Sequence, residues 1–200
     1  MHLPSSLFFV ALTCAALICW VNADDQHIDD DVNGLLERES FLDDTELTSN
    51  DEEDRQFNTF SQQCLQAHND YRKKHGVAPL VLDQKVTAVA QNWANTLAAR
   101  NTFAHSGTQG YGENIYATTS TSVSGRDPVN LFYDEIKYYN YNAPGFSLAT
   151  GHFTQVVWKS SKSIGVGVAK GRSGTTYVVV NYYPQGNYQG QFSANVPRPL

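Results

Sequence analysis

The first regular pattern along the chain is a stretch of apolar residues at helical spacing between residues 59 and 76. Thr59 and Gln62 form a capping-box pattern at its start, and Gly76 suits its end. We therefore expect the folded domain to begin with a helix near Thr59. One face of this helix carries Phe60, Cys64, His68, Tyr71 and His75.

Two further stretches predict helices. Residues 83–100 begin with Asp83 as a cap and then repeat apolar residues on one face. Residues 127–139 begin with Asp127 as a cap and place Pro128 in the first turn, where its missing N–H costs no hydrogen bond.

After Gly151 the pattern changes to short β-rich runs. These runs are residues 152–158, 164–170 and 175–183, and they predict a meander of three strands with turns between them. Helices come first and antiparallel strands follow, so the pattern predicts an α+β fold packed in layers.

The N-terminal part of the chain differs from the rest. Residues 1–23 contain an apolar run from Leu7 to Val21 that suits a signal peptide, although Lys and Arg are absent before it. We expect a secreted protein rather than a membrane-anchored one, because the run is short for a membrane span.

Charge divides the remainder of the chain. Residues 24–55 hold 14 acidic and 2 basic side chains, whereas residues 56–200 hold 6 acidic and 12 basic ones. We expect residues 24–58 to be a disordered acidic segment, either a propeptide that masks the basic domain or a solvated linker. Residues 59–200 then form the domain.

The cysteines predict no intramolecular disulfide. Cys14 and Cys19 leave with the signal peptide, and Cys64 remains alone on an apolar helix face. We interpret Cys64 as a small buried apolar residue, so that the hydrophobic core alone must hold the fold.

Four ionisable side chains are candidates for chemistry. His105 follows the second helix, Glu113 lies in a glycine-flanked turn, Glu135 lies on the third helix, and His152 opens the first predicted strand. Two imidazoles and two carboxylates suit a divalent cation such as zinc. Their spacing alone is weak evidence, and separate helix-face and capping roles remain an alternative.

Other kinds of chemistry find less support. The segment "GFSLA" lacks the final glycine and the strand–turn–helix context of a hydrolase nucleophile. No phosphate-binding loop occurs, and the basic residues are dispersed without interleaved aromatics, so nucleic-acid binding is not expected.

An aromatic cluster surrounds the Pro-Gly turn at residues 144–145. Its members are Tyr138, Tyr139, Tyr141 and Phe146. Such side chains either line an apolar slot, enter a membrane interface or cap the core, and the sequence alone leaves the three open.

Five segments, in order, resemble the motifs of the CAP superfamily, which comprises cysteine-rich secretory, antigen-five and plant pathogenesis-related proteins. They are "HNDYRKKHGVAPL", "YGENIY", "YDEIKYYNYNAPGF", "GHFTQVVWKSS" and "NYYPQGNYQGQF". The resemblance covers about residues 61–197 and is greatest to the Golgi-associated pathogenesis-related-like subgroup. It implies a three-layer α-β-α sandwich with a central antiparallel sheet.

The resemblance also implies a cleft that gathers His105, Glu113, Glu135 and His152. There the imidazoles would bind zinc or another divalent cation, with the carboxylates nearby. Protonated imidazole cannot ligate, so we expect cation binding to fade below about pH 6.

For function, the resemblance implies binding of sterol or other lipid through Tyr139, Tyr141 and Phe146. The subgroup's link to anionic membranes suits the basic domain. We favour a secreted, non-enzymatic lipid binder. The alternatives are a metal-dependent hydrolase with Glu113 or Glu135 as general base, and an extracellular defence or signalling protein that acts through a protein partner.

Overall fold

The computed structural model describes residues 29–200, with side chains from residue 49 onward. The expected signal peptide at 1–23 lies outside the described residues. The described residues fall into two units, which divide after Leu47. Residues 29–47 of the first unit are helical, and the second unit contains the domain described below.

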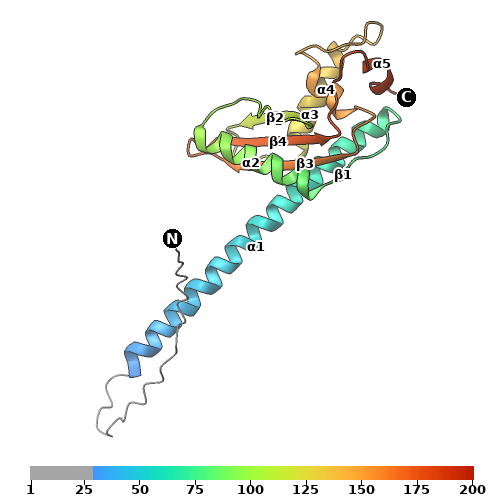
Figure 1. Ribbon diagram of the computed structural model, residues 1–200. Coiled ribbons are helices and arrows are strands. Elements are labelled where there is room, and N and C mark those ends of the chain that lie inside the picture. Colours follow the sequence, from blue (N-terminus) through green and yellow to red (C-terminus); the bar gives the residue numbers. More distant parts are fainter. Residues whose placement is uncertain (1–28) are drawn as a thin grey trace, which may run out of the picture. The chain divides into compact units, whose positions relative to one another are not determined.

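The second unit combines helices with one four-stranded sheet (Figure 1). The elements of the described chain are α1 (Asp29–Lys74), β1 (Val81–Leu82), α2 (Gln84–Arg100), β2 (Gly112–Thr118), α3 (Arg126–Asp134), the 3-10 helix η1 (Glu135–Tyr138), α4 (Gly151–Val156), β3 (Ser163–Lys170), β4 (Thr176–Tyr183) and α5 (Phe192–Asn195). Residues 48–74 of α1 belong to the second unit. The strand order is β1-β3-β4-β2. β4 is antiparallel to both β3 and β2, and only the two-residue β1 runs parallel to β3.

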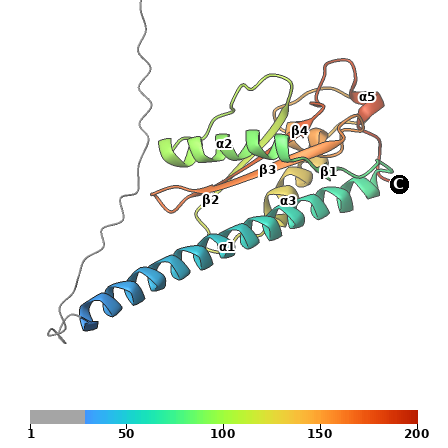
Figure 2. The same ribbon diagram turned by 60° about the horizontal axis from the view of Figure 1, so that its bottom comes forward.

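Helices cover both faces of the sheet, as Figure 2 shows. Because side chains alternate along a strand, β4 sends Tyr177 and Val179 into a core beneath α2. It sends Val178, Val180 and Tyr182 into a second, larger core shared with α1, α3 and α4. This arrangement confirms the three-layer α+β sandwich, with β1 making the sheet mixed.

Two glycines bring α2 close to the sheet. A Cβ atom on Gly165 or Gly167 of β3 would lie 2.1 and 2.4 Å, respectively, from backbone atoms of α2. Any side chain at these positions would therefore push the helix away. Asp83 caps α2 as expected, since its carboxylate accepts hydrogen bonds from Lys85 and Val86 N–H.

The expected strand at 152–158 is wrong, because its first residues form α4. Phe153, Val156 and Val157 are fully buried at positions i, i+3 and i+4, which is one face of a helix. A short apolar run does not distinguish a buried strand from a buried helix by its periodicity. His152 therefore lies in the first turn of a helix.

Other boundaries also differ. Glu113 lies on β2 rather than in a turn, and the strand that holds it was not expected. α1 begins at Asp29, so the capping pattern at Thr59 lies inside a continuous helix. The expected helix at 127–139 starts at Arg126 and changes to a 3-10 helix at Glu135.

Arg72 of α1 is fully buried and holds three segments together. Its guanidinium donates to the carbonyl oxygens of Val156 (3.0 Å), Trp158 (2.9 Å) and Ser161 (3.1 Å), and its Nε donates to that of Ala78 (2.8 Å). Burial lowers the pKa of Arg72 to about 10, so it stays charged at neutral pH. No described carboxylate forms an ion pair with it.

Replacing Arg72 with methionine should lower the free energy of unfolding by about 3 kcal/mol or more, because several buried carbonyl groups lose their donor. Denaturant unfolding measures the change. The matched control is Arg126→Lys, at a half-exposed ion pair with Asp70, which should cost less than about 1 kcal/mol. Equal, small losses in the two variants would contradict this role for Arg72.

Candidate functional site

His152 and Glu135 form one imidazole–carboxylate pair at the start of α4. His152 Nδ1 donates to Glu135 Oε1 at 2.7 Å. Glu135 Oε2 accepts hydrogen bonds from the backbone N–H groups of His152 (3.0 Å) and Phe153 (3.1 Å). The carboxylate thus fixes the ring and also satisfies N–H groups of the first helical turn.

His105 and Glu113 form a second pair. His105 Nδ1 donates to Glu113 Oε1 at 2.8 Å, and the backbone N–H of Ser106 donates to the same oxygen at 2.9 Å. The Glu113 side chain is only 9% exposed, whereas that of His105 is 61% exposed. The pair therefore presents its imidazole to solvent and its carboxylate to the interior.

Each partner changes the pKa of the other in this second pair. The hydrogen bond to Glu113 raises the pKa of His105 above its usual value, against a smaller opposing effect of burial. Burial tends to raise the pKa of Glu113, but the hydrogen bonds from His105 and Ser106 together outweigh it and lower the pKa.

Asn114 connects β2, the strand that holds Glu113, to His152 of α4. It follows Glu113 on β2, and its side-chain amide donates to the carbonyl oxygen of His152 at 3.2 Å. The same amide donates to the hydroxyl of the fully buried Tyr182 at 3.1 Å. One asparagine side chain therefore spans from the strand that holds Glu113 to the helix that holds His152.

The chain of hydrogen bonds continues to α1. Tyr182 donates its hydroxyl hydrogen to His68 Nε2 at 2.7 Å, since His68 Nδ1 donates to the carbonyl oxygen of Cys64 at 2.8 Å. The His68 side chain is fully buried. No sequence pattern indicates that His68 supports Asn114 through Tyr182. Cys64 is fully buried, as expected.

The structure thus brings the four candidate residues into two pairs. Among the described residues no group of three or more His, Cys, Asp or Glu side chains is arranged to hold a metal ion. Within each pair, however, Nδ1 is occupied by a carboxylate, which leaves Nε2 as the nitrogen able to bind a cation. A carboxylate that orients a ligating histidine in this way is common in zinc sites, so the residues fit such an ion.

The aromatic cluster divides between the core and the surface. Tyr139 is buried against Phe153, with ring centroids 5.5 Å apart, and Tyr141 packs edge-on to Tyr139 at 4.8 Å. Phe146 is 47% exposed. Two of the three expected lipid-binding residues therefore belong to the core and its margin.

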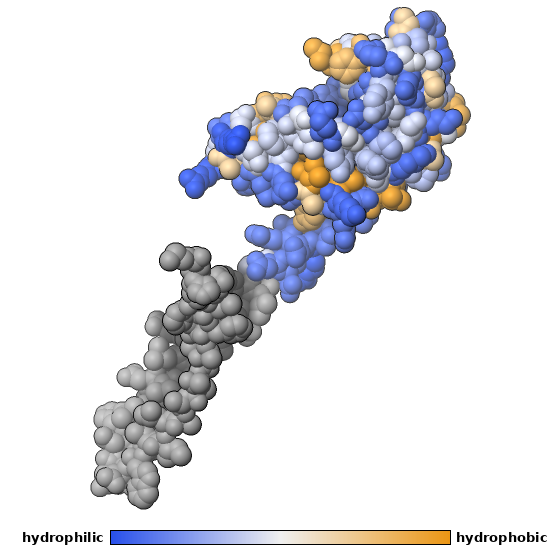
Figure 3. Space-filling view, viewed as in Figure 1, coloured by the Kyte–Doolittle hydropathy of each residue, from blue (hydrophilic) through white to orange (hydrophobic). Residues whose placement is uncertain are grey.

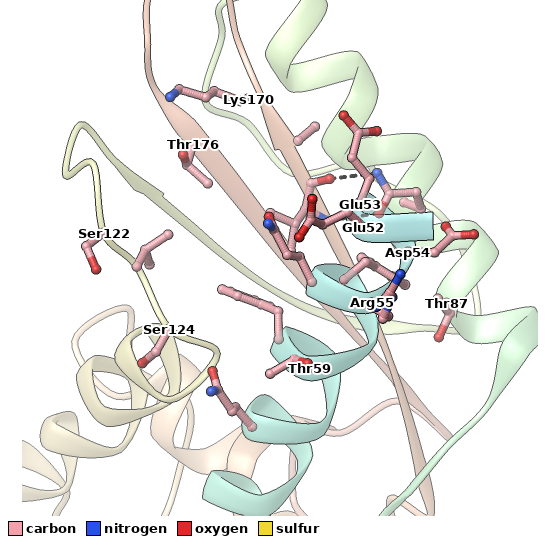
Figure 4. Close-up of a pocket in the computed structure, with 18 of the residues that line it drawn as sticks. Glu52, Glu53, Asp54, Arg55, Thr59, Thr87, Ser122, Ser124, Lys170 and Thr176 are labelled. Carbon is pink, nitrogen blue, oxygen red and sulfur yellow. Dashed lines mark hydrogen bonds between the residues drawn. The ribbon is translucent and has the colours of Figure 1, made fainter. Parts of the chain in front are cut away.

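A groove of about 1220 Å³ lies elsewhere in the domain (Figure 4). Residues 52–63 of α1 form one wall, and parts of α2, β3 and the segment 122–124 form the others. Beside the groove, the side-chain amide of Gln91 donates a hydrogen bond to the carbonyl oxygen of Val168 and accepts one from its N–H, as a neighbouring strand would. None of the four candidate residues lines this groove.

Comparison with known proteins decides the family. The family model for the cysteine-rich secretory protein family, CAP, matches residues 65–182. The chain belongs to the CAP family. It is 42% identical over 145 residues to human Golgi-associated plant pathogenesis-related protein 1, covering 70% of this chain and 94% of that protein. It is 39% identical over 132 residues to pathogenesis-related protein 1A of Nicotiana tabacum, covering 65% and 78%.

Solved structures show the same fold. A crystal structure of NaASP2 with Zn2+ matches with a TM-score of 0.56 and 22% identity, over 70% of this chain and 85% of that one. A crystal structure of Na-ASP-1 matches with a TM-score of 0.54 and 24% identity, over 64% of this chain and 39% of that one. Over residues 29–200, no helix is both long and apolar enough for a membrane span.

Burial of His68 gives the CAP domain a testable pH dependence. Desolvation lowers the pKa of His68 from 6.5 to about 4, so the unfolded chain takes up this proton first as pH falls. Stability from this group is complete above about pH 6.5 and declines toward pH 4, with a loss of about 2 kcal/mol by pH 5. Urea unfolding of wild type and His68→Gln at pH 7 and pH 5 measures this loss. The part of the stability loss that comes from protonation of His68 should be absent in the variant. An identical pH dependence of the two proteins would contradict it.

Proposed function

We propose that this CAP protein is a secreted, non-enzymatic binding protein. In this proposal its two His–Glu pairs bind a divalent cation, zinc. The loop between η1 and α4, which carries the aromatic cluster, binds sterol or another lipid. The observation that carries the cation part is that both imidazoles point Nδ1 at a carboxylate and keep Nε2 available. The likeness to NaASP2, whose crystal structure is described as containing Zn2+, supports the choice of metal.

Hydrogen bonding favours binding over hydrolysis. A general base needs a carboxylate oxygen that can reach a bound water. Both oxygens of Glu135 are occupied by His152 and Phe153, and Glu113 has one oxygen bonded by His105 and the other buried. The carboxylates therefore suit orientation of the imidazoles better than proton transfer.

The lipid part depends on exposed apolar side chains in the loop between η1 and α4. Phe146 is 47% and Leu148 is 87% exposed, and Tyr138 at the end of η1 is 65% exposed. Figure 3 shows apolar surface at the end of the domain where this loop lies. Clustered apolar side chains of this kind suit contact with a lipid, and the excess of basic residues after residue 55 suits an anionic membrane surface.

Zinc binding tests the cation part. Isothermal titration calorimetry at pH 7.5 should detect zinc binding to the wild type, and His105→Ala with His152→Ala should abolish it. Affinity should fall as pH drops from 7.5 to 5, because protons compete for imidazole and the pKa of His105 is raised. His75→Gln, which alters a histidine bonded to Pro197 and Tyr133, is the control and should bind as wild type does. Unchanged affinity in the double variant, or at pH 5, would refute the site.

A sterol and vesicle pull-down tests the lipid part. Phe146→Ala combined with Leu148→Ala should reduce retention of the protein, because these side chains supply exposed apolar surface. Leu131→Ala is the matched control, since Leu131 is 57% exposed but lies on α3 outside the loop. If all three proteins are retained equally, the loop is not the lipid site. Tyr139 and Tyr141 stay unchanged in these variants, because their loss would disturb the core.

A further inference from the structure

Three buried polar atoms beside the His105–Glu113 pair have no hydrogen-bond partner among the described residues. They are Glu113 Oε2, Asn181 Oδ1 and Asn181 Nδ2. The residue Asn181 is fully buried, and the Glu113 side chain is 9% exposed. Leaving buried polar atoms without partners costs about 1–3 kcal/mol for each group, so a set of three requires an explanation.

These atoms belong to one place in the sheet. Glu113 of β2 and Asn181 of β4 are direct partners in the antiparallel register. Directly opposed residues share one face of a sheet, with Cβ atoms about 5 Å apart. On the other side of Asn181 the partner is Gly165, where the α2 backbone occupies the space of a side chain. The Asn181 side chain therefore has the α2 backbone on its Gly165 side and Glu113 as its other cross-strand neighbour.

The chemistry of the three atoms selects the ligand. Glu113 Oε2 and Asn181 Oδ1 are acceptors, whereas Asn181 Nδ2 is a donor. A metal ion or an ammonium group could satisfy the two acceptors but would leave the donor unpaired. A water molecule can donate twice and also accept, and buried waters typically make about three hydrogen bonds to such groups.

We infer that Glu113 and Asn181 together bind a buried water molecule, and that Asn181 thereby acts as a positioning residue for His105. The water holds Glu113 Oε2 in the interior, so that Oε1 stays directed at His105 Nδ1 and Ser106 N–H. This fixes the Nδ1–H form of His105 and presents Nε2 outward. The consequence for zinc rests on the proposed function, whereas the consequence for the imidazole does not.

The variant Asn181→Leu tests the inference, because it removes both amide atoms at similar size. Loss of such an outer contact typically lowers metal affinity about 10-fold or more, and calorimetry should show this for zinc. In the zinc-free protein, 15N NMR of neutral His105 should show the Nδ1–H form in wild type and a mixture with the Nε2–H form in the variant. Wild-type affinity together with an unchanged imidazole would overturn the inference.

Val179→Ala is the matched control, since Val179 is fully buried on the same face of β4, two residues from Asn181. It should reduce stability while leaving zinc affinity and the form of His105 unchanged. An equal response in the two variants would reduce Asn181 to a packing role and overturn the inference. Asn181→Ser, whose hydroxyl can still hold a water, should retain most of the zinc affinity and the Nδ1–H form of His105. If Asn181→Leu does not fold, the crystal structure of the wild type decides the inference.

A high-resolution crystal structure of the zinc-free wild type provides the direct test. It should show a water within about 3 Å of both Glu113 Oε2 and the Asn181 amide. A direct hydrogen bond between the two side chains without a water would overturn the inference. If the wild type binds no zinc, the proposed function fails, and the NMR and crystallographic results still decide this inference.

Discussion

The position of the candidate site depends on how a short helix is held at its two ends. α4 has six residues, too few to be stable alone in water. The Glu135 carboxylate accepts from N–H groups at its first turn, and the Arg72 guanidinium donates to carbonyl groups at and after its last. Each charge complements the helix dipole at its end. His152 is placed by this arrangement, because it is the second residue of α4.

Within the described residues, the hydrogen bonds of the Arg72 side chain all go to backbone oxygens. Its guanidinium reaches these oxygens because the side chain is fully buried between their segments. A guanidinium offers five donors in a fixed plane, and here four hydrogen bonds reach the carbonyls of Ala78, Val156, Trp158 and Ser161. Lysine could not reproduce that planar geometry. The cost of burying the cation is offset only while all these segments stay in place, so Arg72 makes their arrangement cooperative.

The sequence predicts much of the fold because local signals agree with the final packing. Asp83 caps α2, and the β3–β4 hairpin follows two β-rich runs joined by a glycine-containing turn. The predictions were wrong where tertiary contacts override local pattern. α4 looks like a strand because all its apolar residues are buried, and Thr59 lies inside a longer helix despite its capping pattern.

The candidate site shows the same limit. The sequence pattern already indicated all four residues, and the resemblance to the CAP family implied that they share a cleft. The pairing of His105 with Glu113 and of His152 with Glu135 became visible only in the structure. Asn114 and Asn181 had no signal of their own, because an asparagine in a strand has no pattern that distinguishes a surface residue from a buried donor. Their roles depend on cross-strand register, which one-dimensional spacing does not contain.

The proposed cation and lipid sites share one continuous segment of chain, and this links them physically. The hydrogen bond from His152 to Glu135 closes a loop that begins at η1 and ends at α4. Phe146 lies within this loop, and its ring lies so close to Gly151 that an added Cβ atom there would be 3.1 Å from Phe146 Cε2. Tyr139 anchors the same loop by packing on Phe153 in α4. A ligand that displaced the loop would therefore have to work against the hydrogen bonds that orient His152, whereas a cation bound to His152 would strengthen the closure that holds the loop in place.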